Sequence, residues 1–368
     1  MKNYDIYKNL LLNKKKITYD LDILKNKLDN YTKKKLFIVT SETAIISNGG
    51  GFRAAKCATH LVNLGYFVIY MFVYIAPHNL MVNLDINHEL FGYYILRNNP
   101  INKIKNLLGG LDIKYIHLSP TKQVVDLHKN FNNKFIYDLR DNWKGGMGSK
   151  WYDSENEDWL IKNADKLTAS SQYFIDINPS LEMELISNGY NDLYFNKNKT
   201  FERPKDMPKD GKVIIYFGSL MCSWIDYNLI KYIGENVNAS ILLIGNYNTR
   251  FMRKAKLKNI FFLGQKENNL IPNYLYYSDV GIMPFRITKT SSCSNSNKLF
   301  EYLSLDKPVV LTNIKYATEF NNAYKSKNYK EFLDNVKYCL SDSFEFKYES
   351  KIKEYAWSNL VKGYLTLG

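Results

Sequence analysis

The segment Val213-Ile214-Ile215-Tyr216-Phe217-Gly218-Ser219 is an apolar run that closes on a glycine. It opens a series of similar short runs, each followed by polar or helical sequence. The other members of the series are residues 241–245, 260–264, 280–284 and 308–312. Short apolar runs separated by helical stretches are typical of parallel strands that helices cover on both faces. The second half of the chain is therefore predicted to be a Rossmann-like α/β domain.

The first half shows the same alternation, with a glycine loop after its first strand. Residues 36–40 form a short apolar run, and residues 48–51 read Asn-Gly-Gly-Gly. A helical stretch over residues 52–64 then ends at Gly65, the expected place for a helix to stop. Further strands are predicted at residues 67–73, 115–118, 135–137 and 166–169. The order strand, glycine loop, helix, strand predicts a second Rossmann-like domain, the two facing a central cleft.

A polar stretch over residues 196–212 contains Pro204 and Pro208 and is the predicted linker between the domains. We therefore expect a first domain over residues 1–200, which includes a basic helical extension over residues 1–35. A second domain is expected over residues 201–345. Residues 346–368 are expected to form a helix that returns to the first domain.

The charge balance favours anionic partners. The 368 residues carry a formal net charge of +14. Ten Lys and four Asp lie within residues 1–35, with lysine runs at residues 14–16 and 33–35. A basic balance favours nucleic acid, an anionic membrane surface or phosphorylated substrates. The lysine runs are typical of solvated surface, and an anionic membrane patch is the alternative reading for them.

The cysteines and the apolar runs predict a cytoplasmic protein. The four cysteines lie far apart without a CxxC pair, which predicts neither a disulfide framework nor a zinc site. The first residues show no signal-peptide pattern. The longest apolar run, residues 66–77, is too short to cross a bilayer. Any membrane association is therefore expected to be peripheral, at the inner membrane face.

An ordered set of motifs in the second half resembles the donor-binding domain of GT-B glycosyltransferases. The resemblance is to the retaining, GT4-like group 1 enzymes that build bacterial surface glycans and polysaccharides. The strongest motif is Asn297-Lys298-Leu299-Phe300-Glu301-Tyr302-Leu303-Ser304, which continues to Lys307-Pro308-Val309-Val310. The supporting motifs are Tyr216-Phe217-Gly218-Ser219 with Trp224-Ile225-Asp226, residues 259–264, residues 271–275 with 279–284, and Tyr355-Ala356-Trp357-Ser358 in the tail.

The resemblance implies a site for a nucleotide-sugar, whose diphosphate leaves with developing negative charge. GT-B enzymes offset that charge with basic side chains and helix N-termini, so no metal or other cofactor is expected. Lys298 is implied to meet the diphosphate and Glu301 the ribose hydroxyls. The remaining donor-binding candidates are Asn297, Gly218, Ser219 and Gln265. The alternative for Lys298 and Glu301 is an ordinary pair of surface helix charges.

Candidate residues in the first half come from two loops. Gly50, Gly51 and Arg53 are candidates for contacting phosphate or the acceptor, against the simpler reading of a tight turn. Asp141 and Asp138 follow a predicted buried strand at its carboxyl end, where ligands bind in such sheets. Asp141 is the first candidate for activating the acceptor hydroxyl and Asp138 the second. A helix cap or a salt bridge with the neighbouring arginine is the alternative.

Two further side chains of the first half have competing readings. Trp143 is interpreted as stacking on a sugar face or as packing. His117 ends a strand and could reach the cleft, although a core or rim position is the more usual place for such a histidine.

Two departures from the family pattern bear on the donor and on stereochemistry. Cys293 occupies the position of a second glutamate that many retaining relatives have eight residues before the one equated with Glu301. The arginine and lysine usual after the first strand of the domain are replaced by residues 221–224. Arg250, Arg253 and Arg286 are the candidates to substitute for them.

The sequence thus predicts transfer of a sugar from a nucleotide-sugar to a glycan or a lipid-linked acceptor, with retention favoured by analogy. A phage-type DNA-modifying glycosyltransferase would use the same basic surface on phosphates, with steep salt dependence. A non-catalytic glycosyltransferase-like subunit would explain Cys293, but the presence of Lys298 and Glu301 argues against it. A sugar-nucleotide epimerase shares the fold and acts without an acceptor.

Overall fold

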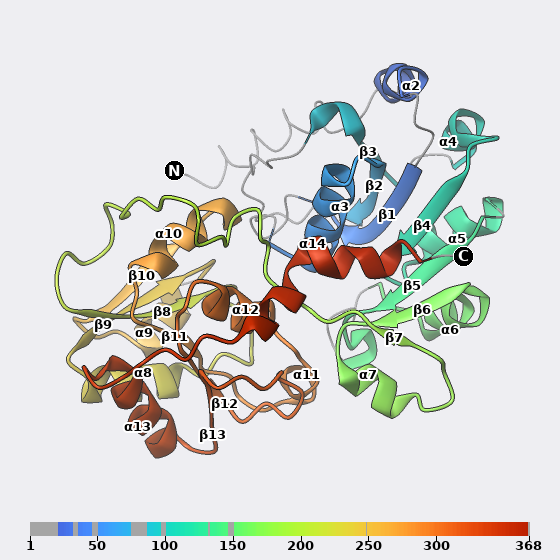
Figure 1. The fold of residues 1–368 in the computed structure, drawn as a ribbon. Helices are drawn as coiled ribbons and strands as arrows, with labels where there is room; N and C mark the ends of the chain where they lie inside the picture. The colour runs from blue at the N-terminus through green and yellow to red at the C-terminus, as the bar shows by residue number, and fades with distance from the viewer. Residues whose placement is uncertain are drawn as a thin grey trace. The chain divides into compact units, whose positions relative to one another are not determined.

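The structure is a computed structural model that describes residues 21–31, 36–45, 51–74, 87–96, 101–131, 133–145, 151–247 and 249–366. The chain divides into two compact units (Figure 1). Unit 1 comprises residues 1–170, 178–186 and 361–368, and unit 2 comprises residues 171–177 and 187–360. The stretch 196–212, predicted as the linker, lies inside unit 2. The two parallel sheets, one in each unit, make this an α/β protein.

Unit 1 is built on a parallel sheet in the order β3-β2-β1-β4-β5-β6-β7. Its strands are β1 (Leu36–Thr43), β2 (Phe67–Tyr74), β3 (Phe91–Ile95), β4 (Ile113–His117), β5 (Phe135–Leu139), β6 (Lys166–Ala169) and β7 (Glu184–Leu185). The side chains of β5 are all buried, as are the first six of β1. Continuous burial is expected of central parallel strands, because helices cover both faces.

The helices of unit 1 follow the predicted alternation. They are α2 (Leu21–Asp29), α3 (Arg53–Asn63), α4 (Ile101–Leu108), α5 (Lys122–Asn130) and α6 (Ser154–Asn163), with short 3-10 turns η2 (His88–Leu90), η3 (Trp143–Gly145) and η6 (Val361–Tyr364). Helix α3 packs on β1 and β2 (Figure 1). It stops where the sequence predicts, because Gly65 has φ +85° and donates its N–H to the Val62 carbonyl at 2.9 Å.

Unit 2 is built on a second parallel sheet, in the order β10-β9-β8-β11-β12-β13. Its strands are β8 (Lys212–Phe217), β9 (Ala239–Ile244), β10 (Ile260–Gly264), β11 (Val280–Met283), β12 (Val309–Thr312) and β13 (Ala323–Ser326). The five strands predicted in this half are confirmed to within two residues at each end. A strand at residues 323–326 was not predicted, because its half-buried sequence lacks an apolar run.

The helices of unit 2 are α7 (Gln172–Ile177), α8 (Tyr227–Asn236), α9 (Thr249–Lys254), α10 (Ile271–Tyr276), α11 (Lys289–Ser292), α12 (Asn297–Ser304), α13 (Tyr329–Leu340) and α14 (Trp357–Leu360), with η4 (Asn268–Leu270) and η5 (Ser350–Tyr355). Helix α13 packs on β12, β13 and α8, while α12 packs on β12 and η5. The apolar side chains of both layers form one continuous core.

The tail differs from the single helix that the sequence suggests. It consists of η5, α14 and η6, and the break before α14 lies at Ala356, whose backbone is extended with ψ 135°. Ala356 forms a parallel bridge with Tyr190, and the N–H of Trp357 donates to the Tyr190 carbonyl at 3.1 Å. Because those groups pair with another segment, a continuous helix cannot form there. Residues 361–368 nonetheless belong to unit 1.

Among the residues that the structure describes, none of the helices has both the length and the apolar character needed to cross a membrane.

Candidate active site

The carboxyl end of β8 in unit 2 brings Gly218 against Lys298. A Cβ atom placed on Gly218 would lie 2.4 Å from Lys298 Cε and 2.7 Å from Lys298 Nζ. The φ angle of Gly218 is +136°, which side chains rarely adopt. Lys298 therefore lies directly over the loop that follows β8, and the family resemblance predicts that the diphosphate binds there. A side chain at position 218 would occupy that space.

A second glycine allows this loop to lie close to the neighbouring strand. Gly245 follows β9 with φ +155°, and a Cβ there would lie 1.8 Å from the Gly218 carbonyl oxygen. The N–H of Gly245 donates to the carbonyl of Gly264, the last residue of β10, at 2.9 Å. Three adjacent strands thus end on glycines. Because these glycines carry no side chain, a ligand can approach the backbone at this edge closely.

Helix α12 presents its N-terminus together with Lys298. Its first residue, Asn297, has a side-chain oxygen that is buried without a hydrogen-bond partner among the described residues. The N-cap residue Ser296 makes no side-chain cap to the helix. Amide groups at a helix N-terminus attract anions, so α12 adds a partial positive charge to that of Lys298.

Three side chains show the environment of the Lys298 ammonium. Lys298 Nζ lies 5.7 Å from the centroid of the Tyr216 ring, at the end of β8. Burial raises the pKa of the Cys222 thiol, and the Ser219 hydroxyl and the Lys298 charge act in the opposite direction. Ser219 and Cys222 therefore belong to the same cluster as Lys298.

The other predicted donor-binding residues take separate positions in unit 2. Glu301 lies one helical turn after Lys298 and is only 3% exposed, which excludes the reading of an ordinary surface charge. Gln265 directly follows Gly264 at the end of β10 and is half-buried. The structure thus brings Gly218, Ser219 and Lys298 together, with Glu301 on the same helix as Lys298 and Gln265 at the end of the edge strand.

The arginines considered as substitutes follow the two strands that flank β8 in the sheet, and Arg286 comes first. It follows β11, which is the neighbour of β8 in the sheet, and its N–H donates to the Trp224 carbonyl at 2.7 Å. Its side chain is 47% exposed and its Nε lies 3.8 Å from Asp226. Arg250 and Arg253 lie on α9, after β9. Cys293 is buried and cannot supply the charge of a glutamate.

In unit 1, Asp138 and Arg53 form an ion pair in the core. Arg53 donates to Asp138 from Nε at 2.6 Å and from Nη2 at 3.1 Å. Thr168 also donates to Asp138, at 2.7 Å, and Arg53 Nη2 reaches the Ile186 carbonyl and the Tyr364 hydroxyl. Asp138 is 0% exposed and Arg53 is 4% exposed. This geometry favours a structural role for both residues and speaks against the predicted contacts with acceptor or phosphate.

The glycine loop before α3 is described only in part. Gly50 lies outside the described residues, and Gly51 is half-buried at the start of the described segment. The predicted role of these two glycines at phosphate or acceptor stays a prediction. The lysine runs at residues 14–16 and 33–35 also lie outside the described residues.

Asp141 belongs to a charged cluster at the carboxyl edge of the unit 1 sheet. Arg140 Nη2 lies 2.5 Å from Glu42, at the end of β1, and Arg140 Nε lies 3.5 Å from Asp141. Burial raises the pKa of Asp141 to about 6, with Arg140 acting in the opposite direction and Glu42 raising it further. The Asp141 side chain remains 36% exposed. A partly exposed carboxyl that titrates near neutral pH is suited to proton transfer.

Glu42 is the member of this cluster that sequence reasoning missed. It is the second-last residue of β1, directly after six buried residues. Strand β1 is two strands away from β5, so only the sheet order places Glu42 beside Arg140. Its position at the carboxyl end of a predicted central strand was the available signal.

The remaining candidates of unit 1 are packed in the interior. Trp143 is 3% exposed, with the Arg140 guanidinium 4.9 Å from its ring centroid and Trp151 at 5.0 Å. This favours packing over stacking on a sugar. His117 is 0% exposed, and its Nδ1 lies 2.9 Å from the Thr40 hydroxyl. Burial lowers its pKa well below the usual value, and the charge of His128 acts in the same direction. His117 is therefore a neutral core residue.

Among the described residues, no group of three or more His, Cys, Asp or Glu side chains is arranged to hold a metal ion.

Comparisons with known proteins match the second half of the chain most specifically. The family model described as "Glycosyl transferases group 1" matches residues 211–342, which include β8 to β13. The "Putative teichuronic acid biosynthesis glycosyltransferase TuaH" of Bacillus subtilis (strain 168) is 26% identical over 177 residues. That alignment covers 45% of this chain and 44% of the relative, so it spans less than half of the relative's length.

Solved structures match over most of the chain. A glycosyltransferase from Rickettsia africae ESF-5 has a TM-score of 0.62 at 16% identity, covering 91% of this chain and 97% of the other. Anabaena HepE in complex with UDP has a TM-score of 0.60 at 13% identity, covering 90% and 94%. At these identities the likeness shows the fold. Residues 211–342 therefore match the glycosyl transferases group 1 model, and the chain as a whole has the GT-B fold of these structures.

Proposed function

We propose that the protein transfers a glycosyl group from a nucleotide-sugar to a glycan or lipid-linked acceptor, with retention of configuration and without a metal ion. The observation that carries the proposal is the position of Lys298 over Gly218 at the carboxyl end of β8. Parallel sheets bind ligands at that edge, and a lysine at a helix N-terminus meets a diphosphate there.

Charge stabilisation of the leaving diphosphate is the main chemical task of unit 2 in this proposal. Bond cleavage to the sugar leaves negative charge on the diphosphate oxygens. Lys298 and the amides at the start of α12 offset that charge, and they act without reorganisation because the helix holds them in place. Arg286 supplies a second cation from the end of β11. Glu301, one turn further along α12, accepts hydrogen bonds from the ribose hydroxyls.

Asp141 is the proposed acceptor-side residue in unit 1. A carboxyl with a pKa of about 6 is ionised at neutral pH and still basic enough to take a proton from an attacking hydroxyl. Arg140 orients it, and Glu42 holds Arg140 on the other side. Asp138 has no part in this step, because its oxygens are occupied by Arg53 and Thr168.

Names of similar proteins support a choice of donor and acceptor. Anabaena HepE is solved with UDP and with UDP-glucose, which makes a uridine diphosphate sugar the first donor to test. The TuaH relative is named for teichuronic acid biosynthesis, which supports a polysaccharide or its lipid-linked precursor as the acceptor. The basic segment over residues 1–35 would then rest on an anionic membrane surface.

The test measures binding of a panel of nucleoside diphosphates and nucleotide-sugars, by thermal unfolding and by calorimetry. A ligand at 100 times its dissociation constant adds about 2.7 kcal/mol of stability. We expect the nucleotides that carry one particular base to stabilise the protein. This stabilisation should be lost in Lys298→Ala and in Glu301→Ala. Lys337→Ala, on the exposed last turn of α13, is the matched control and should behave as wild type. Absence of stabilisation by every nucleotide in well-folded protein would refute the donor site.

A further inference from the structure

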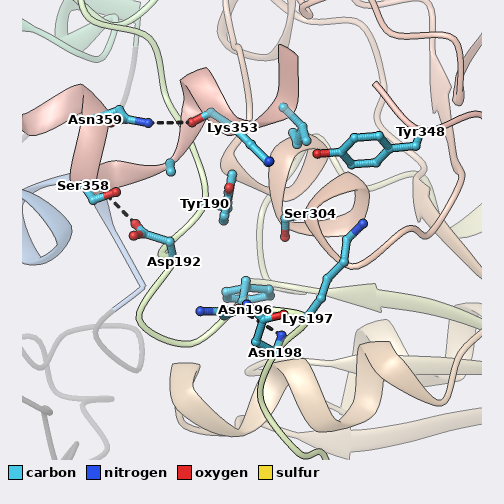
Figure 2. A pocket seen from close by; sticks show the side chains of 13 residues that line it. Tyr190, Asp192, Asn196, Lys197, Asn198, Ser304, Tyr348, Lys353, Ser358 and Asn359 are labelled. Carbon is cyan, nitrogen blue, oxygen red and sulfur yellow. Dashed lines mark hydrogen bonds between the residues drawn. The ribbon is translucent and has the colours of Figure 1, made fainter. Parts of the chain in front are cut away.

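Unit 2 contains a pocket at the opposite end of the helix that carries Lys298. Its volume is about 490 Å³, within the usual range for small-molecule sites. Ser304, the last residue of α12, lies in its wall (Figure 2). Lys298 and Asn297 are at the first turn of the same helix. The pocket is therefore separate from the proposed donor site.

Two chain segments form most of the wall, beside Ser304. They are residues 190–198, which follow the point where the chain enters unit 2, and residues 348–359, which precede the point where it leaves. Backbone pairing between Tyr190 and Ala356 holds the segments together. The N–H of Ser358 also donates to the Asp192 carboxylate at 3.0 Å. The walls are thus fixed by hydrogen bonds before any ligand arrives.

The charge of the pocket is set by two lysines. The Lys197 ammonium contacts Asp306 and lies 4.6 Å from the centroid of the Tyr348 ring. Within the described part of the chain, the exposed Lys353 ammonium forms no ion pair with a carboxylate. Figure 2 shows the Lys353 side chain extending towards Tyr348. Among the described residues that line the pocket, two lysines stand against one carboxylate, Asp192, so the lining has an excess of one positive charge for an anionic group.

The rest of the lining suits a hydroxyl-rich molecule. Amide and hydroxyl side chains can donate and accept at once, as sugar hydroxyls require. Asn359 Nδ2 donates to the Lys353 carbonyl at 2.9 Å, and Asn196 accepts the Asn198 N–H at 3.0 Å, so these amides are oriented. Tyr348 is 52% exposed and offers an aromatic surface beside them.

We propose that this pocket binds a phosphorylated monosaccharide, with Lys353 on the phosphate and the oriented amides on the sugar hydroxyls. Its occupant would connect the entering and leaving segments of unit 2 and contact the end of α12. The proposal is independent of the proposed catalytic function, since it concerns residues outside the donor and acceptor sites.

Lysine acetylation followed by mass spectrometry tests the site directly, with glucose 1-phosphate as the probe. We expect saturable protection of Lys353 and Lys197 and none of Lys351, which lies on the same 3-10 turn but outside the pocket. In Lys298→Ala the protection of both lysines should persist, which separates this pocket from the donor site. Equal labelling of Lys353 with and without millimolar probe would overturn the proposal.

Variants and fragments of the probe refine the test. Lys353→Gln should abolish the protection of Lys197 and weaken calorimetric affinity for glucose 1-phosphate about tenfold, because a charge-assisted hydrogen bond is lost. Lys351→Gln is the matched control and should bind as wild type, with both variants checked for folding by circular dichroism. If inorganic phosphate alone protects the lysines as well as glucose 1-phosphate does, the proposed contacts with sugar hydroxyls are wrong. If glucose alone protects as well as glucose 1-phosphate, the proposed contact between Lys353 and a phosphate is wrong.

Discussion

Arg53 binds both carboxylate oxygens of Asp138 in the core of unit 1, from Nε at 2.6 Å and from Nη2 at 3.1 Å. The same guanidinium donates to the Tyr364 hydroxyl at 2.8 Å. Arg53 begins α3, Asp138 is in β5, and Tyr364 is in the tail of the chain. One ion pair therefore connects three elements of unit 1 that are far apart in sequence.

Breaking this ion pair should destabilise unit 1. Arg53→Ala leaves the Asp138 carboxylate buried without its cation, and removal of one partner of a buried pair costs about 3–5 kcal/mol. Urea unfolding followed by circular dichroism measures the loss. Thr168→Val removes only a neutral donor to the same carboxylate, so its loss of about 1–2 kcal/mol should be smaller. Equal stability of Arg53→Ala and wild type would contradict the structural role.

Gly218→Ala should remove nucleotide binding. The added Cβ would lie within contact distance of Lys298 Nζ at a φ of +136°, so it displaces the ammonium and strains the backbone. We expect calorimetric affinity for the stabilising nucleoside diphosphate to fall more than about tenfold, or about 1.4 kcal/mol. Gly211→Ala is the matched control, because Gly211 has φ +85° with no atom within 4 Å of its Cβ position. It shares the backbone strain and should keep the affinity.

Arg286→Gln should weaken diphosphate binding less than Lys298→Ala does. The Arg286 side chain is 47% exposed, so solvent screens its charge. A loss of about fivefold in affinity, or about 1 kcal/mol, is expected by calorimetry at low salt. Arg253→Gln, on α9, should have no effect. If Arg253→Gln weakens binding and Arg286→Gln does not, the second cation comes from α9.

The pH dependence of transfer should reflect Asp141. Its pKa is raised to about 6, so its ionised form is lost as the pH falls through 6. We expect kcat/KM to decrease below that pH, as measured by product formation with the identified donor. Asp141→Asn should remove most of the activity at all pH values. Unchanged activity in Asp141→Asn would exclude the residue as the base.

Stability has the opposite pH dependence at this residue. A carboxyl whose pKa is raised on folding contributes stability below its unfolded pKa, and this contribution is lost as the pH rises through about 6. Thermal unfolding of Asp141→Asn should therefore lack the decrease that wild type shows between the ordinary carboxyl pKa and pH 6. The Asn variant is a close match in size and keeps a polar group at the site.

Much of the fold could be predicted, because apolar runs specify buried strands one at a time. The runs at residues 213–217, 260–264 and 280–284 each became a strand of unit 2. The interruption of the helix in the tail could not be predicted from the sequence. It depends on pairing between Ala356 and Tyr190, which are 166 positions apart in the chain. Backbone pairing over such a separation leaves no local pattern.

The candidate site divides in the same way. The motif around Lys298 and Glu301 was recognisable because it lies in one continuous helix, and the structure places Lys298 over Gly218. Asp138 and Asp141 looked equivalent in sequence, three residues apart after one strand. Only the packing distinguishes them, because Asp138 lies inward against Arg53 and Asp141 stays partly exposed beside Arg140.

The sequence by itself determined the alternation of strands and helices, the glycine stops and the position of the donor motif, since each depends on neighbours within a few residues. The tertiary structure alone decided which charges are buried, which carboxylate can titrate, and which residues line the pocket at the end of α12. Burial and electrostatic environment depend on segments that the sheet order brings together, such as β1 with β5 or residues 190–198 with 348–359.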